Sequence, residues 1–309
     1  MTDQNAEEGK PIVIKDKSGN ELTAYELDGI PLPIFPESFI GNSTPAHLKK
    51  VREMTIRDDD VIICAYPKAG THWIWEVVQM LTSQNTEYHK DIKEKQMIEA
   101  AKIESIDSEP SPRVLNSHLW PQHLPKQMFE KKTKIIFVNR NPKDILISLF
   151  WHYTGAEKEI GYLGNLSDFI DLFLNKRLLY GLWYEYTLEW ERFLKTTENP
   201  FFELSYEDMQ QNSLHHVREL AKFLGRHVTD ELGSAIVDAC SFDKLKKAND
   251  EVKDDFLKPL FKEGLSIFRK GKVGDWKNWL TVAESENIDR VTAERMKDSQ
   301  VQLKYTIEK

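Results

Sequence analysis

The 309-residue chain has few cysteines, no long hydrophobic run and no excess of positive charge. The first two absences exclude a disulfide-stabilised secreted domain and a membrane-spanning protein. Neither Cys64 nor Cys240 stands in a metal-ligand spacing, so we expect buried free thiols and a reducing compartment. The formal net charge of -8 argues against a nucleic-acid partner, because phosphate backbones are bound by basic surfaces. We therefore expect a cytoplasmic protein in which a local cluster of cations still allows a small anionic ligand.

The order of the predicted elements indicates an α/β fold. Residues 1–10 are polar and acidic and are expected to form a flexible tail, while residues 11–309 form a single domain. Residues 12–27 predict two short extended segments around a turn, and the prolines of residues 28–36 predict an irregular loop that lines a pocket. From residue 56 onward strands alternate with helices, which is typical of a central parallel β-sheet flanked by helices.

The segment VIICAYPKAGTHWIWEVVQML, residues 61–81, predicts a strand, a tight loop and a helix. Residues 61–65 are apolar throughout, as in a strand buried on both faces of a parallel sheet. From residue 73 the apolar residues recur every three or four positions, which is the period of one helix face. Lys68, Gly70 and Thr71 occupy the loop, where the backbone N–H groups and dipole of the helix favour an anion.

Reactive side chains stand at the carboxyl ends of the predicted strands: Lys68, His118, Arg140 and Tyr206. The strands themselves are predicted at residues 61–65, 112–118, 134–140 and 201–206. Helices are expected after residue 140, with Asn141 as the cap, and from a Ser213 cap to a Gly225 stop. Because ligands of open α/β sheets bind at the carboxyl edge of the strands, these side chains predict an active site there.

The loop around Gly70 differs from the phosphate-binding loop of nucleoside triphosphatases, in which Lys and Ser or Thr directly follow a second glycine. Here Lys68 precedes Gly70, so no magnesium site is indicated, and taken alone the loop is better explained as a solvated turn. Arg140 is either a snorkelling cation at a strand end or a bidentate phosphate clamp, with Ser148 adding a hydroxyl from the following helix.

Two further motifs have both an ordinary and a functional interpretation. Arg269-Lys270-Gly271 is either a basic surface run or a pair of cations on flexible backbone that suits a doubly charged phosphate. His118 is either a core histidine with satisfied hydrogen bonds or a general base near neutral pH.

Together these motifs resemble the cytosolic sulfotransferase family. The family's 5′-phosphosulfate loop, Tyr-Pro-Lys-Ser-Gly-Thr-Thr-Trp, matches residues 66–73, and its 3′-phosphate segment matches Arg140, Lys143-Asp144 and Ser148. The family element Arg-Lys-Gly-x-x-Gly-Asp-Trp-Lys matches residues 269–277, and YEDM appears at residues 206–209. The similarity runs in consistent order from about residue 30 to the C-terminus.

The resemblance implies a P-loop-like sulfotransferase fold and the donor 3′-phosphoadenosine 5′-phosphosulfate (PAPS), with PAP as product and no metal. It implies in-line transfer of the sulfuryl group to a hydroxyl or amine of a small-molecule acceptor, with His118 as general base and Lys68 stabilising the leaving phosphate. Asn116 and His118 would contact the acceptor, and Trp73 and Phe242 would sandwich the adenine. The implied donor-binding residues are Lys68, Ala69, Gly70, Thr71, His72, Trp73, Arg140, Ser148, Tyr206, Cys240, Ser241, Phe242, Arg269, Lys270 and Gly271.

Four residues depart from the family pattern. Ala69 replaces serine, His72 and Cys240 replace threonine, and Asn116 replaces a lysine two residues before the catalytic histidine. A thiol such as that of Cys240 is a weaker hydrogen-bond partner than a hydroxyl, so these replacements either weaken donor binding or are offset by an imidazole N–H from His72. The change at Asn116 concerns the acceptor side more than the chemistry.

Lys277, Thr281-Val282 and Glu286 resemble the family's short dimer contact, Lys-x-x-x-Thr-Val-x-x-x-Glu. The alternative is a polar linker. In a two-fold dimer the β-forming Thr281 and Val282 would pair with their mates, and Lys277 would meet Glu286 twice. So small a patch predicts a weak, salt-sensitive homodimer.

Two other functions share part of this pattern. A nucleotide kinase or triphosphatase also binds phosphate at a strand-loop-helix junction, but it requires magnesium and a triphosphate. A catalytically silent nucleotide-binding protein would keep the pocket without turnover, and the retention of both Lys68 and His118 speaks against it. The acceptor stays open among phenols, steroids, alcohols and amines.

Overall fold

The computed structural model describes residues 9–156, 160–251 and 268–307. The strands are β1 (Lys10–Lys15), β2 (Glu21–Leu27), β3 (Ile30–Leu32), β4 (Val61–Ala65), β5 (Val114–Ser117), β6 (Lys134–Asn139) and β7 (Phe201–Ser205). The α-helices are α1 (Glu37–Ile40), α2 (Thr44–Glu53), α3 (Thr71–Ser83), α4 (Ile103–Ser108), α5 (Lys126–Glu130), α6 (Pro142–Gly155), α7 (Leu166–Asn175), α8 (Trp183–Thr196), α9 (Tyr206–Gln211), α10 (Ser213–Leu224), α11 (Asp230–Ala239), α12 (Phe242–Glu251) and α13 (Val282–Arg295). Short 3₁₀ helices are η1 (Lys93–Gln96), η2 (Pro121–His123) and η4 (Asp275–Asn278).

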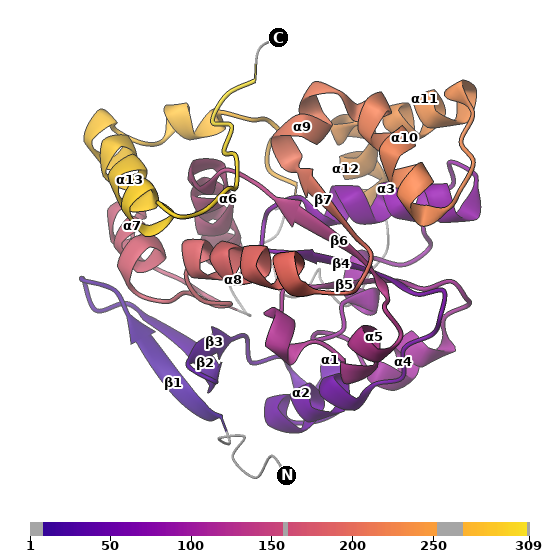
Figure 1. Ribbon diagram of the computed structural model, residues 1–309. Helices are drawn as coiled ribbons and strands as arrows, with labels where there is room; N and C mark the ends of the chain where they lie inside the picture. Colours follow the sequence, from indigo (N-terminus) through magenta and orange to yellow (C-terminus); the bar gives the residue numbers. More distant parts are fainter. Residues whose placement is uncertain (1–8, 157–159, 252–267, 308–309) are drawn as a thin grey trace.

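A central parallel sheet with strand order β5-β4-β6-β7 confirms the predicted α/β fold. β4 lies between β5 and β6, and all of its residues are buried, as its unbroken apolar sequence predicts. α3 packs on β4 and β5. In Figure 1, α9 to α12 gather near α3 on one side of the sheet, while α6, α7 and α13 lie on the other side of the view.

The N-terminal segments form a separate antiparallel sheet, β1-β2-β3 (Figure 1). β1 and β2 confirm the two extended segments, and Lys10 belongs to β1 instead of the predicted tail, whose residues 1–8 lie outside the described residues. The prediction of an irregular loop at residues 28–36 is wrong at β3, where Pro31 pairs with Glu26. β3 lies at the edge of its sheet, a position that tolerates a residue without a backbone N–H.

The helix that follows β6 begins where the sequence predicts, whereas α3 already begins at Thr71, which the sequence places in the preceding loop. Gly70 caps α3 with φ of 109°, and Asn141 caps α6 by accepting a hydrogen bond from the backbone N–H of Asp144. α10 ends at Gly225 in the left-handed conformation, but its cap is Asn212 in place of the predicted Ser213. The side chain of Asn212 accepts from a backbone N–H of the first turn, which an asparagine does as well as a serine.

Both cysteines are buried free thiols, as predicted. Burial raises the pKa of both thiols above the ordinary value. Within the described part of the chain, no helix is both long and apolar enough to cross a bilayer.

Candidate active site

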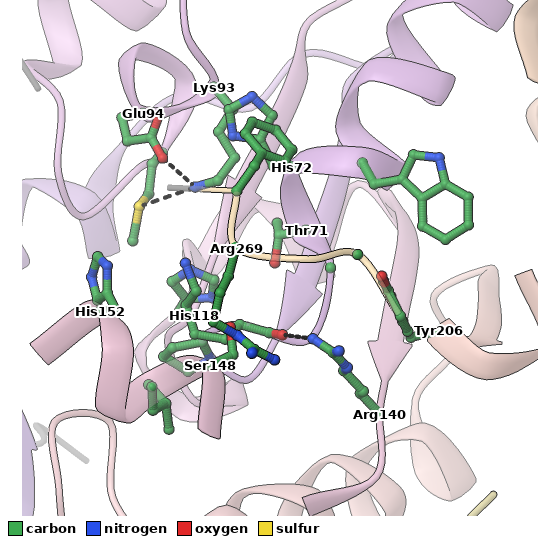
Figure 2. Close-up of a pocket in the computed structure, with 18 of the residues that line it drawn as sticks. Thr71, His72, Lys93, Glu94, His118, Arg140, Ser148, His152, Tyr206 and Arg269 are labelled. Atoms are coloured by element: carbon green, nitrogen blue, oxygen red, sulfur yellow. Dashed lines mark hydrogen bonds and ion pairs between the residues drawn. The ribbon is translucent and has the colours of Figure 1, made fainter. Parts of the chain in front are cut away.

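A cavity of about 460 Å³ opens at the carboxyl edge of the central sheet. The four side chains predicted to converge there, Lys68, His118, Arg140 and Tyr206, all line it, and Figure 2 shows the last three. The other predicted site residues on its wall are Gly70, Thr71, His72, Trp73, Ser148, Cys240, Ser241, Phe242, Arg269, Lys270 and Gly271. Ala69 and Asn116 are buried and do not appear on the wall. The loop between β3 and α1 contributes Pro33 and Phe35, so the prediction that residues 28–36 line a pocket is confirmed.

The loop between β4 and α3 is held in a tight conformation by its neighbours. Lys68 and Gly70 both have positive φ, at 68° and 109°. A Cβ atom on Gly70 would lie 2.6 Å from Cδ2 of Tyr206, so only glycine allows this approach. Nη1 of Arg140 donates a hydrogen bond to the carbonyl oxygen of Lys68 at 2.9 Å, and its guanidinium lies 4.1 Å from the ring centroid of Tyr206. These contacts connect the ends of β4, β6 and β7.

Several buried donors on this side of the cavity lack an acceptor. Oγ1 of Thr71, Nε of Arg140 and Nε of Arg269 are buried and have no hydrogen-bond partner among the described residues. An unsatisfied buried donor costs about 1–3 kcal/mol, which an anion within reach would recover. Gly271 packs directly against the ring of Phe242, and only glycine allows this approach, because a Cβ atom there would lie 2.0 Å from Cδ2 of Phe242. The donors therefore fit an anionic ligand such as a phosphate.

Positive charge at the site is partly neutralised. Burial first, and then the charge of Lys93, lowers the pKa of Lys68 to about 8. Asp275 accepts hydrogen bonds from Arg269 and from Lys270, the latter at 2.9 Å. Burial alone would raise the pKa of Asp275, but Lys270 and Arg269 hold it well below its ordinary value. Arg269 thus keeps its charge paired while its Nε remains available.

The ring of His118 is oriented by one backbone carbonyl and by the aromatic ring of Tyr180. Its Nδ1 lies 2.7 Å from the carbonyl oxygen of Ala65, which can only accept, so Nδ1 carries the proton. In the neutral ring Nε2 then holds the lone pair. Burial first, and then the charge of Lys93, lowers the pKa of His118 to about 3, so the imidazole is neutral near pH 7. The ring packs edge-on against Tyr180. This is the tautomer that a general base requires.

The pattern of the sequence did not single out Lys93, Glu94, Glu99 and His152. The first two and His152 line the cavity, and Glu99 supports His118 from behind the wall. Burial and the charge of Lys68 lower the pKa of His152 well below its ordinary value. None of these four residues belongs to a recognisable sequence motif. For Lys93, Glu94 and Glu99, the only available signal is that they shortly precede the strand that carries His118.

The segment predicted to form a dimer contact lies away from the cavity wall. Thr281 is the cap of α13, with a reciprocal capping box to Glu284, and Val282 is the first residue of that helix. Thr281 is thus extended while Val282 is helical, and the pairing of these two residues with a second copy of the chain stays a prediction. Val282 is 74% exposed.

Comparison with known proteins assigns this chain to a family. Residues 58–300 match the family model described as the sulfotransferase domain. Human sulfotransferase 1C2 is 30% identical over 92% of this chain and 96% of its own length, and rabbit amine sulfotransferase is 34% identical over 81% and 85%. The crystal structure of mouse sulfotransferase SULT7A1 complexed with PAP is similar with a TM-score of 0.71 and 27% identity, covering 89% of this chain and 96% of that one. The chain belongs to the sulfotransferase family, and it is an enzyme of that class.

Proposed function

We propose that this sulfotransferase takes its sulfuryl group from PAPS and transfers it to a hydroxyl or amine of a small-molecule acceptor. The observation that carries the proposal is the shared cavity of His118, with its unprotonated Nε2, and a set of buried donors without acceptors. PAPS supplies the sulfuryl group when it is bound. The PAP complex of SULT7A1 supports the same choice of donor.

The donor would lie along the wall formed by the loop after β4 and the start of α6. Thr71 Oγ1 and the backbone N–H groups at the start of α3 would hold the 5′-phosphate, since a helix N-terminus favours an anion. Arg140, Ser148 and residues 269–271 would hold the 3′-phosphate, and Trp73 and Phe242 would flank the adenine. These assignments account for the orphaned Thr71 Oγ1 and for the two guanidinium Nε atoms.

Proton acceptance and stabilisation of the leaving group are then carried out by two different residues. Nε2 of His118 accepts the proton of the acceptor hydroxyl, and its Nδ1–H remains on the carbonyl of Ala65. Lys68, in its protonated form, balances the negative charge that develops on the leaving phosphate. Fixed cations fill the role that a metal has in other phosphoryl-type transfers, so we propose that none is needed. We also propose a cytoplasmic location and a weak homodimer through Lys277, Thr281, Val282 and Glu286.

The experiment replaces His118 by alanine. We expect transfer to fall by about two to four orders of magnitude, because a general base contributes that much. The affinity for PAP measured by calorimetry should stay nearly unchanged, since the imidazole contacts the acceptor and not the donor. His123→Ala is the matched control, because the His123 ring binds Asp28 at 3.0 Å and is not on the cavity wall. Near-normal turnover of His118→Ala, with loss in His123→Ala or His72→Ala, would refute the assignment.

A kinase or triphosphatase would be recognised by its need for magnesium. Transfer from PAPS in excess chelator, without hydrolysis of a nucleoside triphosphate, is the expected result. A silent nucleotide-binding protein would bind PAP but give no sulfated product with any acceptor.

A further inference from the structure

A charged pair lies in the wall of the cavity, at a place where the proposed function gives it no task. Lys93 and Glu94 are consecutive residues of η1, their side chains are 8% and 15% exposed, and both line the cavity. Figure 2 shows the pair on the opposite side of the view from Arg140. Elsewhere the wall includes apolar side chains such as Phe39, Ile160 and Leu179. Ionic groups in so enclosed a place are costly and are usually functional.

The lysine of this pair has a full set of neighbours. Nζ of Lys93 lies 3.0 Å from Oε1 of Glu94, 3.5 Å from Oδ1 of Asn116 and 4.0 Å from Sδ of Met97. Nδ2 of Asn116 donates in return to the backbone oxygen of Lys93 at 2.8 Å. The contact to Glu94 is the short one, and the longer contacts to Asn116 and Met97 further restrict the position of the ammonium group.

The carboxylate of Glu94 can still accept a hydrogen bond. Oε1 of Glu94 pairs with Nζ of Lys93, while Oε2 is buried and has no hydrogen-bond partner among the described residues. Burial alone would raise the pKa of Glu94, but the charge of Lys93 and its hydrogen bond to the carboxylate lower that pKa to about 2, so the group is a carboxylate. The terminal torsion of a glutamate is broad, so a small rotation turns either oxygen toward the cavity. An ionised oxygen without a donor is destabilising, and a ligand that supplies one would bind more tightly.

The charge of the surroundings selects the kind of donor. Lys93 already neutralises Glu94, and Lys68 adds a second positive charge to the same cavity. The histidines that interact electrostatically with the carboxylate are neutral, because burial lowers the pKa of His72 to about 4, that of His118 to about 3 and that of His152 well below its ordinary value. An ammonium group at Glu94 would be repelled by Lys93, whereas a hydroxyl or amide N–H keeps the charge balanced.

We infer that the Lys93–Glu94 pair is an acceptor-specificity element that selects acceptors with a second, uncharged hydrogen-bond donor on an apolar body. The inference rests on the proposed function, because it assumes that the acceptor is bound in this cavity with one hydroxyl at His118. The second donor binds the carboxylate of Glu94 and so orients the first. An acceptor with a single hydroxyl would leave Glu94 unsatisfied.

The test measures binding of matched phenols to the enzyme–PAP complex by calorimetry. Three series carry an alkyl, an ω-hydroxyalkyl or an ω-aminoalkyl chain of two to six carbons opposite the phenolic hydroxyl. At the best chain length, we expect the hydroxyalkyl phenol to bind about tenfold more tightly than the alkyl phenol, as for a hydrogen bond to a charged group. The aminoalkyl phenol should gain less than the hydroxyalkyl phenol.

Two variants assign the preference to the pair. Lys93→Met/Glu94→Leu removes both charges and leaves no unpaired one, so PAP affinity should be kept while the preference disappears. Glu94→Gln keeps the shape and should reduce the tenfold preference to about threefold, because a neutral acceptor forms a weaker bond. Ile160→Val changes an apolar part of the wall and should leave the ratio between the series unaltered.

The possible results separate the inference from the proposed function. No gain at any chain length, a gain that persists in the double variant, or a stronger gain for the aminoalkyl series would each overturn the inference. Failure of the proposed function would appear in another measurement, as the absence of sulfated product from PAPS with every phenol, alcohol and amine tested.

Discussion

The carboxylate of Glu99 accepts a hydrogen bond from the backbone N–H of His118 at 2.6 Å. Its other oxygen accepts from Oγ of Ser117 at 2.9 Å, and that hydroxyl also accepts from the backbone N–H of Leu119. The short segment that presents the proposed general base is therefore held from behind by one buried carboxyl group. Burial raises the pKa of Glu99 to about 7, so the group is partly protonated at neutral pH.

This arrangement predicts that glutamine can replace Glu99. Glu99→Gln keeps an oxygen for the N–H of His118 and resembles the protonated acid, so turnover should stay within about threefold. Glu99→Ala leaves that buried N–H without an acceptor and should lower stability by about 1–3 kcal/mol. It should also reduce kcat about tenfold or more, because the imidazole is no longer fixed. Thermal unfolding and steady-state kinetics measure the two effects. Equal losses in both variants would contradict a positioning role.

The titration of Lys68 predicts a pH dependence for donor binding. Burial and the charge of Lys93 lower the pKa of Lys68 to about 8 in the free enzyme. A bound phosphate favours the protonated amine and so raises this pKa. Binding of PAP near pH 8 should therefore take up a fraction of a proton, and affinity should fall up to about tenfold per unit as the pH rises further.

Calorimetry in buffers with different ionisation enthalpies measures this uptake directly. Lys68→Met should abolish it and weaken PAP binding. Lys270→Met is the matched control, because it removes a lysine from the same cavity and should keep the uptake. A wild-type enzyme whose PAP affinity is constant from pH 7 to pH 9.5 would show that Lys68 does not contact the phosphate.

The two arginines on the donor side should differ in their contribution to affinity. Each has an unsatisfied Nε, and a hydrogen bond to a charged group is worth about 1.5–3 kcal/mol. Arg140→Ala also removes the support of the Lys68 carbonyl, whereas Arg269 is already paired with Asp275. We therefore expect the larger loss of PAP affinity for Arg140→Ala. Unchanged affinity in both variants, with normal thermal unfolding, would remove the phosphate site from this cavity.

The sequence predicts the frame of the site better than its acceptor end. The run of apolar residues in β4 allows only a buried strand, and parallel strands share a carboxyl edge, so Lys68, His118 and Arg140 had to converge. Lys93 and Glu94 stand in a polar stretch, where two adjacent charges are usually solvated. Their burial depends on the packing of η1 against β5, a contact between segments that no local pattern encodes.

Short elements and caps also escaped prediction, for local reasons. β3 contains a proline, which usually ends a strand, and only its place at a sheet edge makes Pro31 acceptable. Thr281 and Val282 have high strand propensity, yet the capping box with Glu284 begins a helix. A side-chain hydrogen bond outweighed intrinsic preference there.

The last prediction concerns the weak homodimer proposed through the start of α13. Val282 is 74% exposed at the first helical position, and none of the four proposed contact residues lines the cavity. Val282→Glu places two like charges near a two-fold axis and should give monomers in sedimentation velocity, with activity unchanged. The helix itself should tolerate the change, because a carboxylate in the first turn interacts favourably with the helix dipole. Val282→Thr keeps the size and should remain dimeric at low salt. A wild-type protein that sediments as a monomer at micromolar concentration and low salt would rule out the dimer.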